Sequence, residues 1–346
     1  MSVQARPVTS SPSRILGSRA LLLPGLLVGT LLLIALLLWS ITLGAAEITP
    51  QVVYTALFNY DPTQYDQLII QTVRLPRVVA GVIVGAALAV AGALMQGLTR
   101  NPLADSGLLG INAGAAFAVV LLVTLTTAPS LTSYAIAALI GAGLAAAFVY
   151  GIGALSGGAT PLRLTLAGVI LTAFVTSLTT AILIQDQETL EQIRFWTAGS
   201  LGGRDFAIIV QTAPLIGAGL VGALLISPQI TTISLGDDVA KGLGQNTLIV
   251  RSFAAVLVVL LAGGAVALAG PIGFVGLVIP HVARFIAGVD YRWIIPYSAL
   301  LGGMLVTLAD VAARVALRPL ELPVGVMLAL VGAPFFIYLA RWKVRR

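Results

Sequence analysis

The chain has 346 residues, of which 58% are hydrophobic and only 9% are charged, and its mean hydropathy is +1.03. Because soluble domains average about 25% charged residues, this composition excludes a soluble protein and predicts a polytopic membrane protein. The lack of cysteine excludes disulfides, thiolate metal sites and thiol nucleophiles. The net charge of +6 is better explained by cytoplasmic loops and ends than by nucleic-acid binding.

Serine, proline and arginine dominate residues 1–19, which are expected to form a disordered cytoplasmic tail. The apolar run at 20–43 is too long for a signal peptide and no clear cleavage site follows it, so it predicts a first membrane span. After a polar interval with an expected interfacial helix at 50–59, further apolar segments predict an all-α transmembrane domain of about ten spans over 20–346. These segments lie near 76–97, 107–128, 132–155, 164–184, 206–227, 249–269, 273–289, 293–314 and 322–341.

The basic residues test this count. If the spans alternate from a cytoplasmic N-terminus, thirteen of the nineteen lysines and arginines fall inside, which obeys the positive-inside rule. Both termini are then expected in the cytoplasm. The six outer residues are Arg74, Arg77, Arg194, Arg204, Arg314 and Arg318.

A polar segment at 227–246 separates two of the predicted spans. Ser234 followed by Asp237 resembles a capping box with Asp in place of Glu, and Asp237 and Asp238 suit the first turn of a helix. Lys241 suits its last turn, and Gly242 and Gly244 stop it. The segment therefore predicts a helix of about two turns, too short to stand alone in water. It is either a solvated turn or a rigid element on which a soluble partner acts.

Catalytic residue types are scarce. His281 is the single histidine, so neither a Ser-His-Asp arrangement with a spare histidine nor a His-rich metal site can be built. No P-loop sequence occurs, so this chain is not expected to hydrolyse ATP. A G-x-G-x-x-G match at 217–222 lies inside an apolar span without a preceding strand, where helix packing is the better explanation.

Asp310 is the one acid deep in a predicted span, where an unpaired charge costs about 2.5–3.5 kcal/mol. Arg314 follows one turn later on the same face, so a structural ion pair is favoured over a proton relay. Arg74 and Arg77 fall at the outer end of the second span, with Pro76 near its first turn. They either anchor the helix by snorkelling or receive carboxylates from a docking protein.

Several long motifs now occur in one order along the chain. They are Arg74-Leu-Pro-Arg77, GAALAVAGALMQ at 85–96, NPLADSGLLGIN at 101–112, GPIGFVGLVIPHVAR at 270–284, LADVAAR at 308–314 and ELPVG at 321–325. Over roughly residues 50–340 the chain thereby resembles the FecCD family, permease subunits of ABC importers for ferric siderophores, haem and cobalamin. One departure is Ser106, where the family commonly has proline.

The resemblance implies two permease subunits, identical or sisters, around a central pathway. It also implies two cytoplasmic ATPase subunits that bind the ATP, and an extracytoplasmic substrate-binding protein. A coupling helix is implied near 234–244, with the coupling residues Leu235, Gly236, Asp237, Asp238, Val239, Lys241, Gly242, Leu243 and Gly244. The implied docking residues are Arg74, Arg77 and Arg314. The implied inner gate is the loop at 156–163, with Ser156, Thr160 and Pro161.

The expected protein is therefore a permease of the bacterial inner membrane without a catalytic site, metal or cofactor of its own. A ferric siderophore is the expected cargo, with haem and cobalamin as alternatives. An ion- or proton-coupled secondary carrier remains a different class of interpretation, although Asp310 is the only intramembrane acid. A membrane-embedded enzyme is disfavoured by that single acid and the single histidine.

Overall fold

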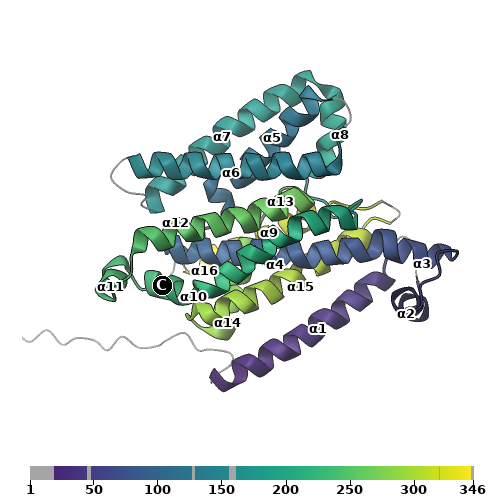
Figure 1. Cartoon of the computed structure of the whole chain (residues 1–346), viewed down its shortest axis with the longest axis horizontal. Coiled ribbons are helices and arrows are strands. Elements are labelled where there is room, and N and C mark those ends of the chain that lie inside the picture. Colours follow the sequence, from purple (N-terminus) through teal and green to yellow (C-terminus); the bar gives the residue numbers. More distant parts are fainter. Residues whose placement is uncertain (1–18, 45–47, 127–128, 156–160, 319, 344–346) are drawn as a thin grey trace, which may run out of the picture.

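The computed structural model of the chain describes residues 19–44, 48–126, 129–155, 161–318 and 320–343. The longer helices run mostly along the length of the molecule (Figure 1), and the described ranges contain no β-strand longer than an isolated bridge. In chain order the helices of the first half are η1 Arg19–Leu21, α1 Leu22–Thr42, α2 Pro50–Phe58, α3 Tyr65–Ile69, the π-helix η2 Ile70–Arg74, α4 Leu75–Thr99, η3 Ser106–Leu109, α5 Ile111–Leu125, α6 Leu131–Leu155, α7 Pro161–Gln185 and α8 Gln187–Thr197. Those of the second half are α9 Phe206–Leu225, α10 Ser227–Ser234, α11 Asp237–Gly242, α12 Thr247–Val258, the π-helix η4 Val259–Gly263, α13 Gly264–Ala269, α14 Val275–Ala287, α15 Tyr291–Val315 and α16 Val324–Lys343.

The expected all-α polytopic fold is confirmed, and every predicted span coincides with a helix. Within the described residues, seven helices are long and apolar enough to cross a membrane. The other three predicted spans are shorter apolar helices, Ile111–Leu125, Val275–Ala287 and Val324–Phe335. The prediction of a span at 273–289 was too long, because the segment 270–274 is not helical and α14 begins at Val275.

The predicted start of the second span was wrong. The helix begins at Tyr65 and continues through the π-helical turn of η2 into α4. Pro76 therefore lies inside a continuous helix, although it has no N–H and its ring crowds the carbonyl one turn earlier. The widened turn before it absorbs this conflict: the N–H of Leu75 donates to the carbonyl of Ile70, five residues back.

The core of the fold is α4, which is almost entirely buried and contacts α9, α10, α12, α13, α14 and α15. Two glycines permit this close packing. A Cβ on Gly85 would clash with the backbone of Gly302 in α15, and one on Gly92 would clash with the backbone of Gly276 in α14. Small residues at such crossings are how membrane helices gain packing energy without a hydrophobic drive between them.

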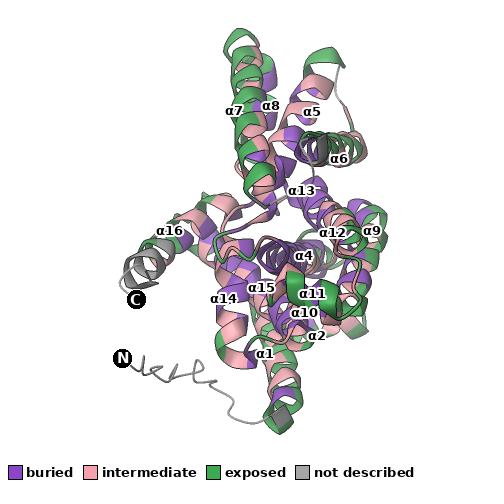
Figure 2. Cartoon of the chain, turned by 90° about the vertical axis from the view of Figure 1, so that its left-hand side faces the viewer, coloured by how far each residue is buried: buried purple, intermediate pink, exposed green. Residues whose placement is uncertain are grey.

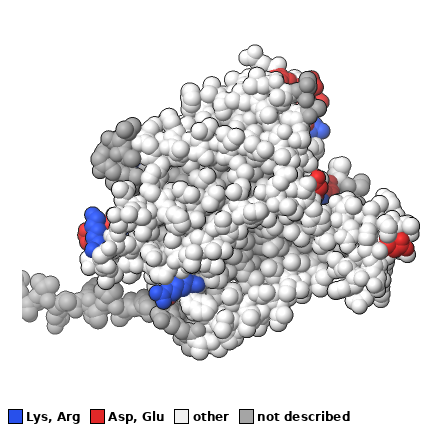
Figure 3. Space-filling model, in the orientation of Figure 1, with Lys and Arg blue, Asp and Glu red and all other residues white. Residues whose placement is uncertain are grey.

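The helices α5 to α8 stand to one side of this core, as Figure 2 shows, and only part of α7 is covered. The visible flank of the molecule is almost free of charge, whereas lysine, arginine, aspartate and glutamate gather at its two ends (Figure 3). One end carries α11 and the start of α1, and the other carries α2, α3 and α8 (Figure 1). An uncharged flank of this kind is suited to lipid.

Candidate docking and coupling sites

At the end that carries α2, α3 and α8, an ion-pair cluster joins α4 to α15. Arg314 Nε lies 3.0 Å from Asp310 Oδ2, which is the pair expected from their one-turn spacing. Asp310 has a second partner that the sequence did not indicate, because Arg77 Nε lies 2.9 Å from its Oδ1. Arg77 in turn donates through Nη1 to Glu321 at 2.6 Å. We call these four residues, Arg77, Asp310, Arg314 and Glu321, the outer cluster.

The outer cluster is also tied to the end of α1. Arg314 donates through Nη2 to the hydroxyl of Ser40 at 2.7 Å and through Nη1 to the Ser40 carbonyl at 3.1 Å. Arg74, one turn before Arg77, donates to the carbonyl of Ile41 at 2.6 Å. Guanidiniums with several donors in a fixed fork are well suited to hold a helix end in this way.

The three arginines expected to meet a docking protein are therefore buried in this chain. Arg74, Arg77 and Arg314 are only 6%, 7% and 3% exposed. None of them snorkels to the lipid surface, which was the alternative role considered for Arg74 and Arg77. Their docking role stays a prediction. Sequence reasoning missed Glu321 because 244 residues separate it from Arg77 and no local spacing links them.

At the opposite end, the segment between α9 and α12 folds into two short helices, and the predicted start of the coupling helix was wrong. Ser234 ends α10, where its hydroxyl donates to the carbonyl of Thr231 at 2.6 Å, so it caps nothing downstream. The second helix, α11, spans Asp237–Gly242 and begins after Gly236, whose φ of +129° favours glycine. The two acids lie in its first turn, as expected.

The far end of α11 follows the expected pattern. Gly244 has a φ of +76°, its N–H donates to the Lys241 carbonyl at 2.9 Å, and the N–H of Gln245 donates to the Ala240 carbonyl at 3.0 Å. These two bonds form a Schellman motif, which turns the chain back towards α12. Three large apolar side chains of this segment are exposed: Leu235, Val239 and Leu243. Only Val239 lies within α11, and the other two flank it.

Asp237 fixes α11 to the rest of the chain. Its Oδ1 lies 2.8 Å from Nη2 of Arg251 in α12 and 3.9 Å from Nη2 of Arg100, which ends α4 in the left-handed region with a φ of +52°. The neighbouring Asp238 and Lys241 are exposed. We call Asp237, Arg100 and Arg251 the inner cluster.

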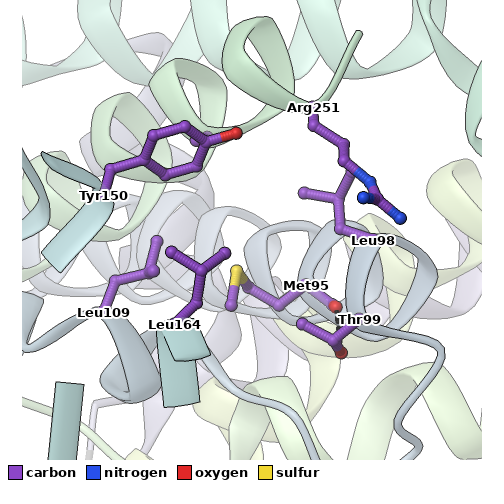
Figure 4. Close-up of a pocket in the computed structure, with 8 residues that line it drawn as sticks. Met95, Leu98, Thr99, Leu109, Tyr150, Leu164 and Arg251 are labelled. Atoms are coloured by element: carbon purple, nitrogen blue, oxygen red, sulfur yellow. Dashed lines mark hydrogen bonds between the residues drawn. The ribbon is translucent and has the colours of Figure 1, made fainter. Parts of the chain in front are cut away.

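Beside the inner cluster the helices pack less closely. Figure 4 shows Arg251 at one side of a pocket and Tyr150 of α6 at the other, with Leu98 of α4 beside Arg251 and with Met95 of α4 and Leu164 of α7 below the space between them. A larger, mainly apolar cavity of about 350 Å³ adjoins it between α6 and α12. Of the expected gate loop, Ser156 and Thr160 lie outside the described residues, whereas Pro161 begins α7. The loosely packed region thus lies beside the first turn of α7.

The loop between α4 and α5 also contacts this region. A Cβ on Gly168 in α7 would clash with the carbonyl of Leu108, so the loop lies directly against that helix. Asp105 accepts from the N–H of Ser106 at 2.7 Å and from its hydroxyl at 3.3 Å. Proline could not make the first of these bonds, so the departure at Ser106 adds a donor to the turn. Burial raises the pKa of the Asp105 carboxyl, and the bonds from Ser106 oppose that shift.

A buried polar chain crosses from α4 to α14 and α15. Pro280 leaves the carbonyl of Gly276 without its helical donor, and Gln96 Nε2 donates to that carbonyl at 3.0 Å. The Gln96 Oε1 accepts from Arg284 Nη1 at 2.6 Å, and Arg284 Nη2 lies 3.3 Å from the Tyr291 hydroxyl. The proline in α14 is therefore accommodated by one side chain of α4.

Comparison with known proteins places these features in a wider context. The FecCD transport family matches residues 32–342. The iron(3+)-hydroxamate import system permease protein FhuB of Bacillus subtilis (strain 168) is 48% identical over 308 residues, which are 88% of this chain and 80% of that protein. The ferric enterobactin transport system permease protein FepD of Escherichia coli (strain K12) is 43% identical over 330 residues, or 95% and 97% of the two chains. A solved structure described as an inward-facing conformation of a metal-chelate type ABC transporter matches with a TM-score of 0.82 and 29% identity, over 92% of this chain and 99% of that one.

Proposed function

This chain belongs to the FecCD transport family and is a permease of an ABC importer, and from that premise we propose that its cargo is an iron(III)–siderophore complex. The named relatives carry iron(3+)-hydroxamate and ferric enterobactin. A hemin transport permease of Yersinia pestis is 37% identical over 323 residues, so haem is the next candidate cargo. Cobalamin follows from the family resemblance alone.

We further propose that the end with α11 faces the cytoplasm, with both termini on that side of the inner membrane. Two ATPase subunits then bind beneath it and supply all ATP binding and hydrolysis, while this chain contributes no catalytic group, metal or cofactor. The observation that carries this proposal is α11 with its flanking residues, a short segment outside the uncharged flank that bears three exposed apolar side chains, Leu235, Val239 and Leu243. Exposed apolar groups gathered on one protruding element are typical of a protein interface.

The opposite end is proposed to receive the substrate-binding protein, with the outer cluster at the centre of the contact. A second permease subunit is proposed to lie against α7. That helix contacts α5, α6, α8 and η3 but leaves most of its length exposed, including the hydroxyl-bearing residues Thr176, Ser177 and Thr180. Hydroxyls are better suited to a helix–helix contact or a pathway wall than to lipid alone. Rocking of the two permeases as the ATPases close and reopen would then expose the pathway to each side in turn.

The structure also bears on the secondary-carrier alternative. Asp310 is buried and paired with the guanidiniums of Arg77 and Arg314, which is the arrangement of a structural ion pair rather than of a carboxyl that faces a pathway. Reconstitution into vesicles separates the two classes. Transport by a carrier would persist without an ATPase and depend on an ion gradient, whereas transport by this chain should require ATPase subunits and ATP.

The coupling role of α11 is tested by Val239→Arg. The new charge enters an apolar contact, and its burial without a partner costs several kcal/mol, so the ATPase should dissociate or hydrolyse ATP without transport. The variant should still insert in the membrane and bind loaded substrate-binding protein, because Val239 lies outside the uncharged flank. Val239→Leu, which keeps an apolar side chain, is the matched control and should transport normally. Normal ATPase stoichiometry with intact transport in Val239→Arg would place the coupling element elsewhere, with the loop at 100–109 as the next candidate.

A further inference from the structure

The outer cluster contains two carboxylates that differ sharply in their surroundings. The Asp310 side chain is 3% exposed, projects from α15 near its C-terminal end and is held by two guanidiniums. The Glu321 side chain is 42% exposed and belongs to the short connection between α15 and α16. Both bind the same arginine, Arg77, through different nitrogen atoms. One of the two partners of Arg77 is therefore fixed in the interior, and the other stands at the surface.

The position of Glu321 explains why its carboxylate can leave without disturbing the fold. The connection is held by backbone bonds on both sides, from the N–H of Leu320 to the Leu317 carbonyl at 2.8 Å and from the N–H of Leu322 to the Ala313 carbonyl at 3.2 Å. The side chain of Glu321 makes none of these bonds. A change in its rotamer releases Nη1 of Arg77 and leaves the connection in place.

Arg77 itself cannot be left without that bond at low cost. Its side chain is 8% exposed, and a buried guanidinium that loses a counter-ion is strongly destabilised. An incoming carboxylate therefore gains little by adding to the cluster but can take over the place of Glu321. Such an exchange keeps a charge-assisted bond on Nη1 throughout.

We propose that Glu321 is a stand-in carboxylate, which occupies the outward-facing donor of Arg77 until an acidic side chain of the substrate-binding protein replaces it. The inference rests on the proposed docking of that protein at this end. It adds that docking is a competition between two carboxylates rather than capture by free arginines. When no partner is bound, the two arginines of the outer cluster are therefore balanced by its two carboxylates.

Competition predicts that removing a charged residue from the docking surface strengthens binding instead of weakening it. Glu321→Gln removes the competing charge while keeping the side-chain shape, so it should tighten binding of the substrate-binding protein by roughly two- to fivefold, the range expected for a partly exposed ion pair. Arg77→Glu removes the shared donor and places like charges together, so it should weaken binding by more than about tenfold. The matched control is Glu191→Gln on α8, which removes the same charge from an exposed site at the same end of the molecule.

The experiment measures binding of the chelate-loaded substrate-binding protein of the same transport system to the complete importer in nanodiscs, at two salt concentrations. Tighter binding by Glu321→Gln with no change in Glu191→Gln supports the exchange. Equal tightening by both variants assigns the effect to overall charge and overturns it. Weaker binding by Glu321→Gln makes Glu321 a direct contact and also overturns it.

Two further arms separate this inference from the docking proposal. If Arg77→Glu weakens binding and Glu321→Gln changes nothing, docking at Arg77 stands and the exchange is wrong. If neither substitution changes binding, the docking site itself is wrong. Should Glu321→Gln lower the melting temperature of the complex, Glu321→Asp replaces it. The shorter acid keeps the charge but draws it back from Arg77, and it should also tighten binding; unchanged or weaker binding by Glu321→Asp overturns the exchange.

Discussion

The outer and inner clusters are built from the same parts and differ in their contact with water. Each places one aspartate between two arginines: Asp310 with Arg77 and Arg314 at 2.9 and 3.0 Å, and Asp237 with Arg251 and Arg100 at 2.8 and 3.9 Å. The Asp310 side chain is 3% exposed, whereas that of Asp237 is 32% exposed. Identical chemistry therefore operates in two dielectric environments.

This difference in exposure predicts that the outer cluster is rigid and that the inner cluster rearranges more easily. In the interior, charges attract strongly, but each depends on its partner to offset the loss of hydration, so the arrangement is rigid. Near water the same pair contributes little and can lengthen or re-form at low cost. The outer cluster joins α1, α4 and α15 through buried contacts, while the inner cluster joins α11 to α4 and α12 through partly exposed ones. Under the proposed coupling, a movement of α11 would therefore break and re-form only partly exposed ion pairs.

The largest effect is expected for Asp310→Asn. The neutral amide leaves Arg314 without its ion-pair partner and Arg77 with Glu321 alone, which should cost about 3–5 kcal/mol of stability. Expression and the melting temperature of the purified protein should fall, and any residual transport should be no more pH-dependent than before. An abundant, folded variant with a shifted pH profile would instead identify Asp310 as a proton carrier and break the comparison.

An intermediate effect is expected for Gln96→Ala. This variant tests whether the loss of stability depends on how deeply a residue is buried or on the end of the molecule at which it lies. This variant leaves the Gly276 carbonyl and the Arg284 guanidinium without a shared partner, and an unsatisfied buried group costs about 1–3 kcal/mol. The melting temperature should fall clearly, although Gln96 lies in the half of α4 nearer the inner cluster. Gln185→Ala, at the exposed end of α7, is the control and should change little. Equal melting temperatures for the two variants would contradict burial as the deciding factor.

The smallest effect on stability is expected for Asp237→Asn. Its ion pairs lie partly in water, so the loss should stay below about 1 kcal/mol and shrink further at high salt. The control is Asp238→Asn, which removes the same charge from the next residue, whose side chain is exposed. A melting temperature as low as that of Asp310→Asn would show that the inner cluster is as rigid as the outer one.

Sequence reasoning succeeded where the signal is local. Long apolar runs predict spans because only helices satisfy their own backbone in lipid, and the one-turn spacing of Asp310 and Arg314 predicts their contact. It failed for Arg77 with Asp310, since 233 residues separate them and only the packing of α4 on α15 brings them together. It also failed at Ser234, whose hydroxyl was expected to cap the next helix but bonds within its own, because α10 had not been anticipated.

The length of the spans shows the same limit. The run of apolar residues at 273–289 contains no charge before Arg284, so composition alone does not reveal that the helix starts at Val275. The break depends on Gly270, whose φ is +74° and whose Cβ position is filled by the carbonyl of Trp196. A contact with the end of α8, which is distant in sequence, therefore holds Gly270 in the conformation that precedes this helix.

The short length of α14 has a consequence for how this helix is held in the membrane. Thirteen helical residues cover only about 20 Å, less than the roughly 30 Å hydrocarbon layer. The non-helical residues 270–274 before it do not extend the helix, and they are buried or half-buried within the protein. Non-helical backbone is tolerated at membrane depth only where protein or a water-filled cavity surrounds it. The contacts of α14 with α4 and α15 are therefore a condition for its place in the bilayer.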